Sequence, residues 1–371
     1  MRSVPSIAFT GGGTGGHIYP GLAVIEELRG RFKGRLVWIG STKDSDRRAV
    51  EAAGVEFFAI PSGKLRRQLS AKNLADVFRV FAGYLAARKL LRELEPALLF
   101  SKGGYVSVAP CRAAAGLGIP VFTHESDLSP GLATRLNARV AETVFTAYEE
   151  TGAALPEALR PRVKQVGNPI RAAFARADAA RGRAFLKIPD GLPLVLVLGG
   201  SQGSLQINQL VASCLPEILG RACLVHQTGL ANSAAPSEGL PCGERYRSMP
   251  YIGDELPDIL AAADLVVTRA GAGGLWEAGA LGKALILVPL AGAGTRGDQV
   301  DNARYFESRG AARVLAGAGA TPERLSQLVY QWLDHPGEAA SAGAAARGIT
   351  HPGAAKSIAS SILERTGATT P

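Results

Sequence analysis

Two glycine-rich runs carry the clearest chemical signal in the sequence. GGGTGGH fills residues 11–17 and GGSQGS fills residues 199–204, each between an apolar stretch and a helical pattern. Consecutive backbone N–H groups at a helix start bind anionic groups such as a diphosphate. The first run also satisfies GxGxxG. However, the next apolar stretch ends without the acid that a dinucleotide ribose requires, and no P-loop lysine follows. We therefore expect two diphosphate cradles, the alternative being tight turns without a ligand.

Ionisable side chains that could move a proton follow two of the predicted strands. His17 lies where the first glycine run meets its helix, a suitable place for a general base beside a bound anion. Residues 124–127, HESD, place three ionisable groups just past a strand end, which favours a site over a solvated loop. Glu125 and Asp127 are therefore alternative bases.

Further loops offer donors and acceptors for a second ligand or a sugar. KGGYVS at residues 102–107 supplies Tyr105, Ser107 and backbone groups, although an ordinary strand-to-helix turn would have the same sequence. RAGAGGLWE at residues 269–277 brings backbone close to a ligand and projects Glu277, whose carboxylate suits the two hydroxyls of a ribose. Gln299 and Asn302 are neutral, directional groups suited to sugar hydroxyls.

Metal-binding and disulfide patterns are weak in this sequence. Residues 44–46, DSD, imitate a DxD metal motif, but two arginines follow at once, so we interpret them as capping a helix N-terminus. No metal is expected. The four cysteines form no CxxC pair, which indicates buried thiols in a reducing compartment. They are Cys111, Cys214, Cys223 and Cys242.

The elements that must position these groups alternate between strands and helices, which predicts parallel sheets covered by helices. A length of 371 residues, 47% of them hydrophobic, allows two domains. The junction is expected near residues 166–169, and residues 354–366 form a closing helix. Ten strands are expected, at Ser6–Thr10, Arg35–Ile39, Leu98–Phe100, Val121–Thr123, Thr143–Thr146, Leu194–Leu198, Cys223–His226, Leu265–Thr268, Ala284–Val288 and Ala312–Leu315.

A net charge of +9 indicates acidic ligands or surfaces. The N-terminus does not resemble a signal peptide, and the longest uncharged stretch contains a glycine-rich turn, so a soluble or peripheral protein is expected. Eight basic residues stand between positions 64 and 92, among large apolar side chains at helical spacing, a pattern typical of a membrane-surface helix. They are Lys64, Arg66, Arg67, Lys72, Arg79, Arg88, Lys89 and Arg92, with Leu74, Val77, Phe78, Phe81 and Leu85 between them. An amphipathic helix packed on the core is the alternative.

Taken together, these segments resemble the MurG family of bacterial cell-wall glycosyltransferases. The matching pieces run from residue 11 to about residue 303, and their order and spacing are specific. They are GGGTGGHIYPGLAV, GGYVS, HES, VGNPIR, GGSQGS, HQTG, RAGAGGLWEAGALGK and GDQVDNA. The resemblance implies an α/β protein of the GT-B fold, with two doubly wound Rossmann-like domains facing a central cleft. It also implies an inverting, metal-independent transfer of N-acetylglucosamine (GlcNAc) that needs no cofactor and forms a β-1,4 bond.

The resemblance also implies roles for individual residues. His17 and Glu125 would be catalytic, with the base left open between His17, Glu125 and Asp127. Gly103, Gly104, Tyr105 and Ser107 would bind the acceptor. The UDP-GlcNAc contacts would be Thr14, Gly15, Gly16, Asp127, Arg171, Ser201, Ile252, Ala272, Gly273, Gly274, Leu275, Trp276, Glu277, Asp298 and Gln299. Many family members carry Gln-Asn where this chain has Ser126-Asp127, and Gln-Gln where it has Asp298-Gln299.

Domain roles and partners follow from the same resemblance. Residues 1–166 would bind the acceptor and the membrane, residues 167–350 would bind UDP-GlcNAc, and residues 351–371 would form a helix that packs back on the first domain. The partners would be UDP-GlcNAc, the lipid-linked muramyl acceptor lipid I, an anionic membrane surface at its cytoplasmic face, and other cell-wall synthesis and division proteins. Alternatives are a diacylglycerol glycosyltransferase, a UDP-GlcNAc 2-epimerase or a basic nucleic-acid-binding protein, although no RNA-recognition signature is present and nucleic acid is not expected.

Overall fold

A computed structural model of the chain describes residues 5–63, 71–189, 191–200, 202–230, 245–292 and 295–367, with backbone alone for residues 71–77. The chain forms two compact α/β units. The first comprises Met1–Arg171 together with Gly353–Pro371, and the second comprises Ala172–Pro352. Ser201, Cys242 and the basic residues Lys64, Arg66 and Arg67 lie outside the described residues, as do the side chains of Lys72, Leu74 and Val77.

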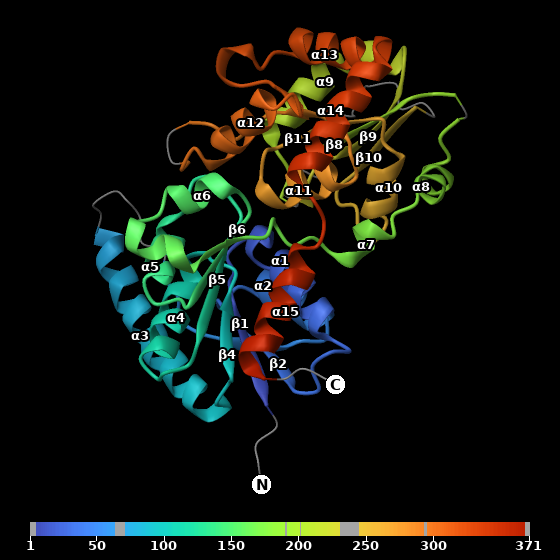
Figure 1. The fold of residues 1–371 in the computed structure, drawn as a ribbon. Helices are drawn as coiled ribbons and strands as arrows, with labels where there is room; N and C mark the ends of the chain where they lie inside the picture. The colour runs from blue at the N-terminus through green and yellow to red at the C-terminus, as the bar shows by residue number, and fades with distance from the viewer. Residues whose placement is uncertain are drawn as a thin grey trace. The chain divides into compact units, whose positions relative to one another are not determined.

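The first unit is built on a seven-stranded parallel sheet in the order β3-β2-β1-β4-β5-β6-β7 (Figure 1). The central strands are fully buried, as expected for a sheet covered on both faces. The strands are β1 (Ser6–Thr10), β2 (Arg35–Gly40), β3 (Glu56–Ala59), β4 (Leu98–Ser101), β5 (Val121–Glu125), β6 (Thr143–Thr146) and β7 (Val163–Gln165).

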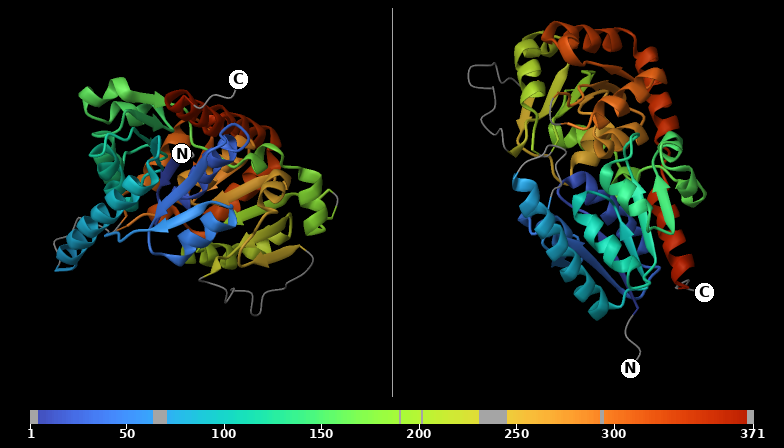
Figure 2. Two further views of the ribbon diagram at one scale, coloured as in Figure 1. Left: turned by 90° about the horizontal axis from the view of Figure 1, so that it is seen from below. Right: turned by 90° about the vertical axis from the view of Figure 1, so that its left-hand side faces the viewer.

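Alternating side chains of β1 divide the core of this unit into two layers. Ile7 and Phe9 face one cluster with residues of α1 and α15, whereas Ala8 faces another with residues of α3 and α4. Figures 1 and 2 show these helices on the two sides of the sheet, and the closing helix α15 packs on α1. The helices are α1 (Tyr19–Leu28), α2 (Asp44–Ala52), α3 (Ala71–Leu94), α4 (Val108–Ala115), α5 (Leu132–Ala138), α6 (Glu149–Ala153) and α15 (Ala354–Thr366).

The second unit repeats this plan with a six-stranded parallel sheet in the order β10-β9-β8-β11-β12-β13. Its strands are β8 (Leu194–Leu198), β9 (Cys223–Gln227), β10 (Tyr246–Met249), β11 (Leu265–Thr268), β12 (Ala284–Leu287) and β13 (Ala312–Val314). Its helices are α7 (Ala172–Ala175), α8 (Ala179–Leu186), α9 (Leu205–Leu219), α10 (Leu256–Ala262), α11 (Ala272–Ala280), α12 (Asp298–Ser308), α13 (Pro322–Asp334) and α14 (Pro336–Ile349).

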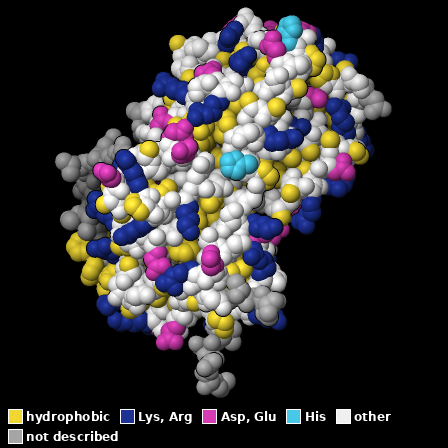
Figure 3. Space-filling view, in the orientation of Figure 1, with side chains coloured by type: hydrophobic (Ala, Val, Ile, Leu, Met, Phe, Trp, Pro, Cys, Tyr) yellow, Lys and Arg dark blue, Asp and Glu magenta, His cyan; other side chains and the backbone are white. Residues whose placement is uncertain are grey.

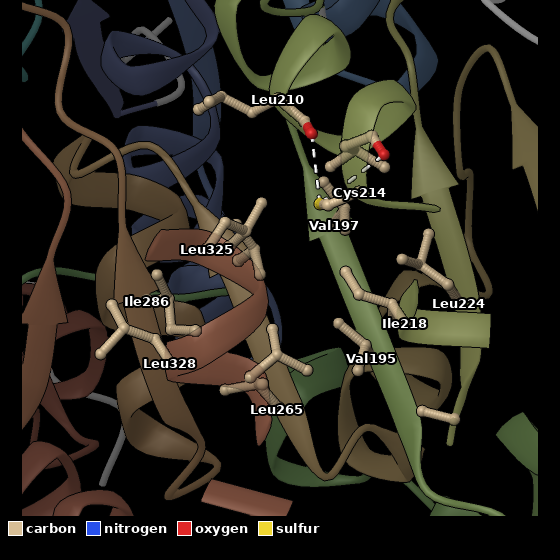
Figure 4. Close-up of a cluster of buried hydrophobic side chains, with 14 of the residues drawn as sticks. Val195, Val197, Leu210, Cys214, Ile218, Leu224, Leu265, Ile286, Leu325 and Leu328 are labelled. Carbon is tan, nitrogen blue, oxygen red and sulfur yellow. Dashed lines mark hydrogen bonds between the residues drawn. The ribbon is translucent and has the colours of Figure 1, made fainter. Parts of the chain in front are cut away.

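Branched side chains of the central strands form the main core of the second unit (Figure 4). Val195 and Val197 of β8 pack against α9 and α13, and the thiol of Cys214 donates to the carbonyl of Leu210 within α9, with an S···O distance of 3.2 Å. Cys111 and Cys223 are likewise buried and not in a disulfide, as the sequence predicted for the three cysteines that the structure describes.

Each sheet has one point at which the strand order reverses, between β1 and β4 in the first unit and between β8 and β11 in the second. Open α/β sheets bind ligands beyond the carboxyl ends of the strands at such a point. The glycine runs follow β1, β4, β8 and β11. The fold therefore places all four loops at the two positions where a ligand is expected.

The prediction of two doubly wound units is confirmed, as are all ten predicted strands, to within two residues at each end. The closing helix has the predicted bounds. Three further strands were not predicted: β3, β7 and β10, each of which lies at the edge of its sheet. Among the described residues, no helix is both long and apolar enough to cross a bilayer.

Candidate active site

The two glycine loops of the first unit pack against each other at the carboxyl ends of β1 and β4. The first leads into a 3-10 helix, Gly15–His17, and the second into another, Tyr105–Ser107. Gly104 has a φ of +78°, and a Cβ built on it would lie 2.8 Å from Cδ2 of His17. A Cβ on Gly13, with a φ of +90°, would lie 2.7 Å from Cε1 of Tyr105. The loops thus meet through glycines, and the half-buried His17 lies at their contact.

Ser107, one of the predicted acceptor contacts, is fully buried. Its hydroxyl donates to the carbonyl of Gly104 over 2.8 Å and accepts from Nδ2 of Asn137, also over 2.8 Å. Both bonds hold the second glycine loop in shape. In this arrangement Ser107 supports the loop from inside, whereas Tyr105 is partly exposed.

The DSD segment opens helix α2, as predicted, but none of its side chains makes a capping hydrogen bond. The N-cap of α2 is Lys43. Asp46 lies in the first turn but is turned inward, with only 2% of its surface exposed. Its Oδ2 accepts from the Ser41 hydroxyl over 2.8 Å and from the Gly13 N–H over 2.7 Å. The capping interpretation is therefore wrong, because the carboxylate binds the neighbouring glycine loop instead.

Glu125, a predicted catalytic residue, is the acceptor for four donors. Its Oε1 accepts from the N–H groups of Ser126 and Asp127, at 2.9 and 3.1 Å. Its Oε2 accepts from the Gly131 N–H at 3.0 Å and from the Thr134 hydroxyl at 2.5 Å. With both oxygens engaged and 5% of its surface exposed, the carboxylate is well placed to fix the turn after β5.

A buried lysine, which sequence analysis overlooked, lies beside this turn. Lys102 directly follows β4, is 1% exposed, and donates from Nζ to the hydroxyl of Ser126. Burial lowers the pKa of Lys102 to about 8, while the charges of Glu125 and Asp127 act to raise it. The sequence did carry a signal for a buried lysine, because Lys102 directly follows an apolar strand. The buried cation lies near Asp127, one of the alternative bases.

His124 is structural in this fold. It is fully buried, and its Nε2 lies 2.8 Å from the carbonyl oxygen of Gly167. Burial, followed by the nearby charge of Lys102, holds the pKa of His124 well below its usual range, so the ring is neutral at ordinary pH. The histidine available for proton transfer in this unit is therefore His17 in preference to His124.

A guanidinium group is held beside the first glycine loop. Cζ of Arg171 lies 5.3 Å from the ring centroid of Tyr19, a cation–π arrangement. The same tyrosine packs on the loop, because a Cβ built on Gly15 would lie 3.1 Å from its Cε2. Arg171, a predicted phosphate contact, therefore lies within reach of the predicted contacts at residues 14–16.

In the second unit, Gln227 joins the third glycine loop to the predicted nucleobase contact. Its Nε2 donates to the carbonyl of Gly200 over 3.1 Å, and its Oε1 accepts from the N–H of Ile252 over 3.0 Å. Ile252 as a whole is 1% exposed and its N–H is engaged, so neither its side chain nor its amide is presented for the predicted contact with uracil. Ser201 of this loop lies outside the described residues.

The predicted contacts at the start of α11 divide into two groups. Gly271 is the N-cap, so the N–H groups of residues 272–274 point out of the helix end. Leu275 and Trp276 are buried in the core, and Trp276 stands edge-on to His351 with a centroid separation of 6.4 Å. Any ligand contact from these two would be through the backbone. Glu277 lies on the half-exposed side of the helix.

Gln299, in the first turn of α12, lies beside the N-terminal end of α11. Its Oε1 accepts from the Leu290 N–H over 2.9 Å, and a Cβ built on Gly271 would lie 3.9 Å from its Nε2. Asp298 is paired with Arg296 at 3.0 Å. Asn302, which we expected to suit sugar hydroxyls, is fully buried and donates to the carbonyl of Ala270 over 3.1 Å. Its amide supports the loop instead.

Comparison with known proteins identifies the family of this chain. The model of the glycosyltransferase family 28 N-terminal domain matches residues 7–146, and that of the C-terminal domain matches residues 194–360. The transferase named UDP-N-acetylglucosamine--N-acetylmuramyl-(pentapeptide) pyrophosphoryl-undecaprenol N-acetylglucosamine transferase from Treponema pallidum (strain Nichols) is 47% identical over 335 residues, covering 89% of this chain and 87% of its own. The enzyme of that name from Treponema denticola is 44% identical over 339 residues, covering 87% of each chain. The chain belongs to the MurG family.

Solved structures extend the likeness to the whole fold. Acinetobacter baumannii MurG superposes with a TM-score of 0.73 at 22% identity, covering 97% of this chain and 99% of that one. The calicheamicin glycosyltransferase CalG4 gives 0.70 at 18% identity, and a UDP-N-acetylglucosamine 2-epimerase gives 0.68 at 15%; both cover at least 98% of each chain. At such identities the likeness identifies the GT-B fold, which transferases and epimerases share. The MurG assignment therefore rests on the sequence relatives.

Proposed function

We propose that this MurG-family chain transfers GlcNAc from UDP-GlcNAc to the MurNAc 4-hydroxyl of undecaprenyl-pyrophosphoryl-MurNAc-pentapeptide. The observation that carries the proposal is 47% identity across 89% of the chain to a relative named for this reaction. Transfer with inversion would form a β-1,4 bond and release UDP. The product would be the disaccharide-bearing lipid used in peptidoglycan synthesis, and the chain would act with other cell-wall synthesis and division proteins.

We assign the donor mainly to the second unit. The outward N–H groups of residues 272–274 would meet the diphosphate, and the Gly200 loop with Ser201 would add further donors. Glu277 would accept from the ribose hydroxyls. Gln299, whose amide nitrogen adjoins Gly271, would bind the GlcNAc hydroxyls. The other proposed phosphate contacts, residues 14–16 and Arg171, lie in the first unit.

His17 is our candidate for the general base. It would take the proton from the acceptor 4-hydroxyl as that oxygen bonds to C1 of GlcNAc and the bond from C1 to the diphosphate oxygen breaks. Its half-buried place between the two glycine loops supports this role. Glu125 is a weaker candidate because its oxygens already accept four hydrogen bonds. Asp127, 9% exposed, remains the alternative.

The acceptor is assigned to the first unit, which we propose binds an anionic membrane surface peripherally, on the cytoplasmic side. Helix α3 buries Ala87 and Leu91 in the core layer that contains Ala8, and its Gly83 lies against Pro61. On its outer side, Phe78, Phe81 and Leu85 are 68%, 60% and 50% exposed, so these apolar groups are not core.

Apolar and basic side chains adjoin in this region in Figure 3. A hollow of about 290 Å³ is lined by Leu85, Arg88, Lys89, Arg92 and Glu93. Exposed aromatic groups beside basic ones suit a lipid interface.

The proposed activity is tested by UDP release from a panel of UDP-sugars, with and without a short-chain lipid I analogue. The proposal predicts release that needs both UDP-GlcNAc and the acceptor. The fold likeness to a 2-epimerase makes that enzyme the second candidate, and it would act on UDP-GlcNAc alone. Release with another sugar, or product formation without the acceptor, would contradict the proposal.

A further inference from the structure

The first glycine loop is held from inside the protein by a carboxylate. The Gly13 N–H donates to Oδ2 of Asp46 over 2.7 Å, and Nζ of Lys43 donates to the Gly13 carbonyl over 3.1 Å. Lys43 is the N-cap of α2, and Asp46 lies in the first turn of that helix. Ser41 at the end of β2 donates its hydroxyl to the same Oδ2 over 2.8 Å, which fixes the position of the carboxylate. Both the N–H and the carbonyl of Gly13 are therefore held by hydrogen bonds.

The loop is shaped for this contact. Asp46 is 2% exposed, and a Cβ built on Gly12 would lie 2.6 Å from its Oδ2, so the absence of a side chain at residue 12 lets the carboxylate approach the backbone. An N–H that donates to an internal carboxylate cannot also donate to a diphosphate. The Gly13 N–H therefore does not belong to the expected anion cradle.

The held segment leads directly to the groups proposed to act on the substrates. Residues 14–16 follow Gly13, and the His17 N–H donates to the carbonyl of Thr14 over 3.1 Å, closing the turn. A shift of the Gly13 peptide would therefore move the His17 ring relative to Gly104. Charge-assisted hydrogen bonds of this kind are about twice as strong as neutral ones.

We propose that Asp46 is a positioning residue for the transfer: its carboxylate fixes the first glycine loop so that His17 keeps its place against the second loop. The inference rests on the proposed function, because the effect is expected in the chemical step. Asp46 itself touches neither substrate in this account. Its loss should accordingly lower kcat much more than it weakens donor binding.

The test compares Asp46→Ala and Asp46→Asn with Asp44→Ala, an exposed acid in the same turn of α2. Loss of a charge-assisted hydrogen bond corresponds to roughly a tenfold to hundredfold change. We expect Asp46→Ala to lose kcat by about that factor, whereas the KM for UDP-GlcNAc and the Kd for UDP should change much less, because most of the proposed donor contacts lie in the second unit. Asp46→Asn should lose less, since its carbonyl can still accept from Gly13. Asp44→Ala should match wild type.

Amide hydrogen exchange of residues 11–18 gives a second measurement that needs no activity. Exchange should be faster in Asp46→Ala, should change less in Asp46→Asn, and should be unaltered in Asp44→Ala. If Asp46→Ala does not fold, Asp46→Asn alone must show both effects. Normal kcat in Asp46→Ala, or unchanged exchange in the loop, would overturn the inference. A wild-type protein without acceptor-dependent transfer would instead refute the proposed function, and the exchange result would still decide whether Asp46 holds the loop.

Discussion

The imidazole of His17 lies so close to Gly104 that a Cβ on the glycine would come within 2.8 Å of Cδ2. This contact ties the loop after β1 to the loop after β4, at the reversal point of the sheet. A histidine packed in this way has little freedom to rotate. If His17 is the base, turnover should depend on Gly104 as well as on the imidazole, because a side chain at residue 104 would displace the ring.

Gly104→Ala should therefore reduce turnover by displacing His17. A matched control is Gly118→Ala, since Gly118 has a similar φ of +73° but nothing within 4 Å of a Cβ built on it. Backbone strain would be alike in the two variants, whereas the collision occurs in one. We expect Gly104→Ala to lose roughly tenfold or more in kcat, and Gly118→Ala to keep near-normal kcat. Equal losses would show that strain, and not the His17 contact, matters.

His17→Ala sets the scale for that comparison. General base catalysis contributes roughly 10² to 10⁴ in rate, so kcat should fall by about that factor while UDP still binds. Near-normal turnover would move the assignment to Asp127 or Glu125, which Asp127→Asn and Glu125→Gln would then separate.

Glu277→Ala should weaken donor binding. A charge-assisted hydrogen bond contributes about 1.5–3 kcal/mol, which is roughly tenfold or more in KM for UDP-GlcNAc. Affinity for the acceptor alone should be unchanged. Glu307→Ala, in the exposed last turn of α12, is a control for loss of an acid in the same unit. A normal donor KM in Glu277→Ala would place the ribose elsewhere.

The buried Lys102 should make the stability of the folded protein depend on pH. Burial lowers its pKa in the folded protein from 10.5 to about 8, so between these values the unfolded chain binds more protons. Stability from this group therefore rises with pH across that window and is lowest below pH 8. The penalty below that window is about 3 kcal/mol, at about 1.4 kcal/mol for each pKa unit.

Chemical unfolding of wild type and Lys102→Met at pH 7 and pH 10 measures this difference. Methionine has a similar volume and no charge. Wild type should gain most of the 3 kcal/mol relative to the variant on going to pH 10, whereas Lys356→Met, at an exposed position, should track wild type. A difference that does not change with pH would mean that the pKa of Lys102 is the same in the folded and unfolded protein, so that burial does not lower it.

The outer side of α3 should control membrane binding. Arg79→Glu with Lys89→Glu should weaken flotation with cardiolipin vesicles, and Phe78→Ser with Phe81→Ser should do so even at high salt, because apolar contacts are not screened. Lys33→Glu with Arg48→Glu makes the same charge change at exposed positions of the same unit, outside α3. Equal binding by both charge-reversed proteins would exclude α3 as the contact.

The central strands could be predicted from sequence because both faces are buried, which leaves continuous apolar runs such as LVLVL in β8. The strands β3, β7 and β10 could not, since these three are partly exposed and their sequences, such as VKQ in β7, lack such a run. The fourth edge strand, β13, was predicted because the apolar Leu315 extends its short run. The glycine loops were located for a similar reason: glycines and strand ends are visible in sequence. Hydrogen bonds between distant segments, such as Asp46 to Gly13, depend on the fold and could not be predicted.

Isolation of the transfer product tests the central claim most directly. Wild-type protein would be incubated with labelled UDP-GlcNAc and a short-chain lipid I analogue, and the linkage in the product determined by mass spectrometry and NMR. The account predicts one GlcNAc per acceptor, β-linked to the 4-hydroxyl of MurNAc, with one UDP released for each bond. An α-linkage, attachment at another hydroxyl, or conversion of the donor without attachment would contradict it.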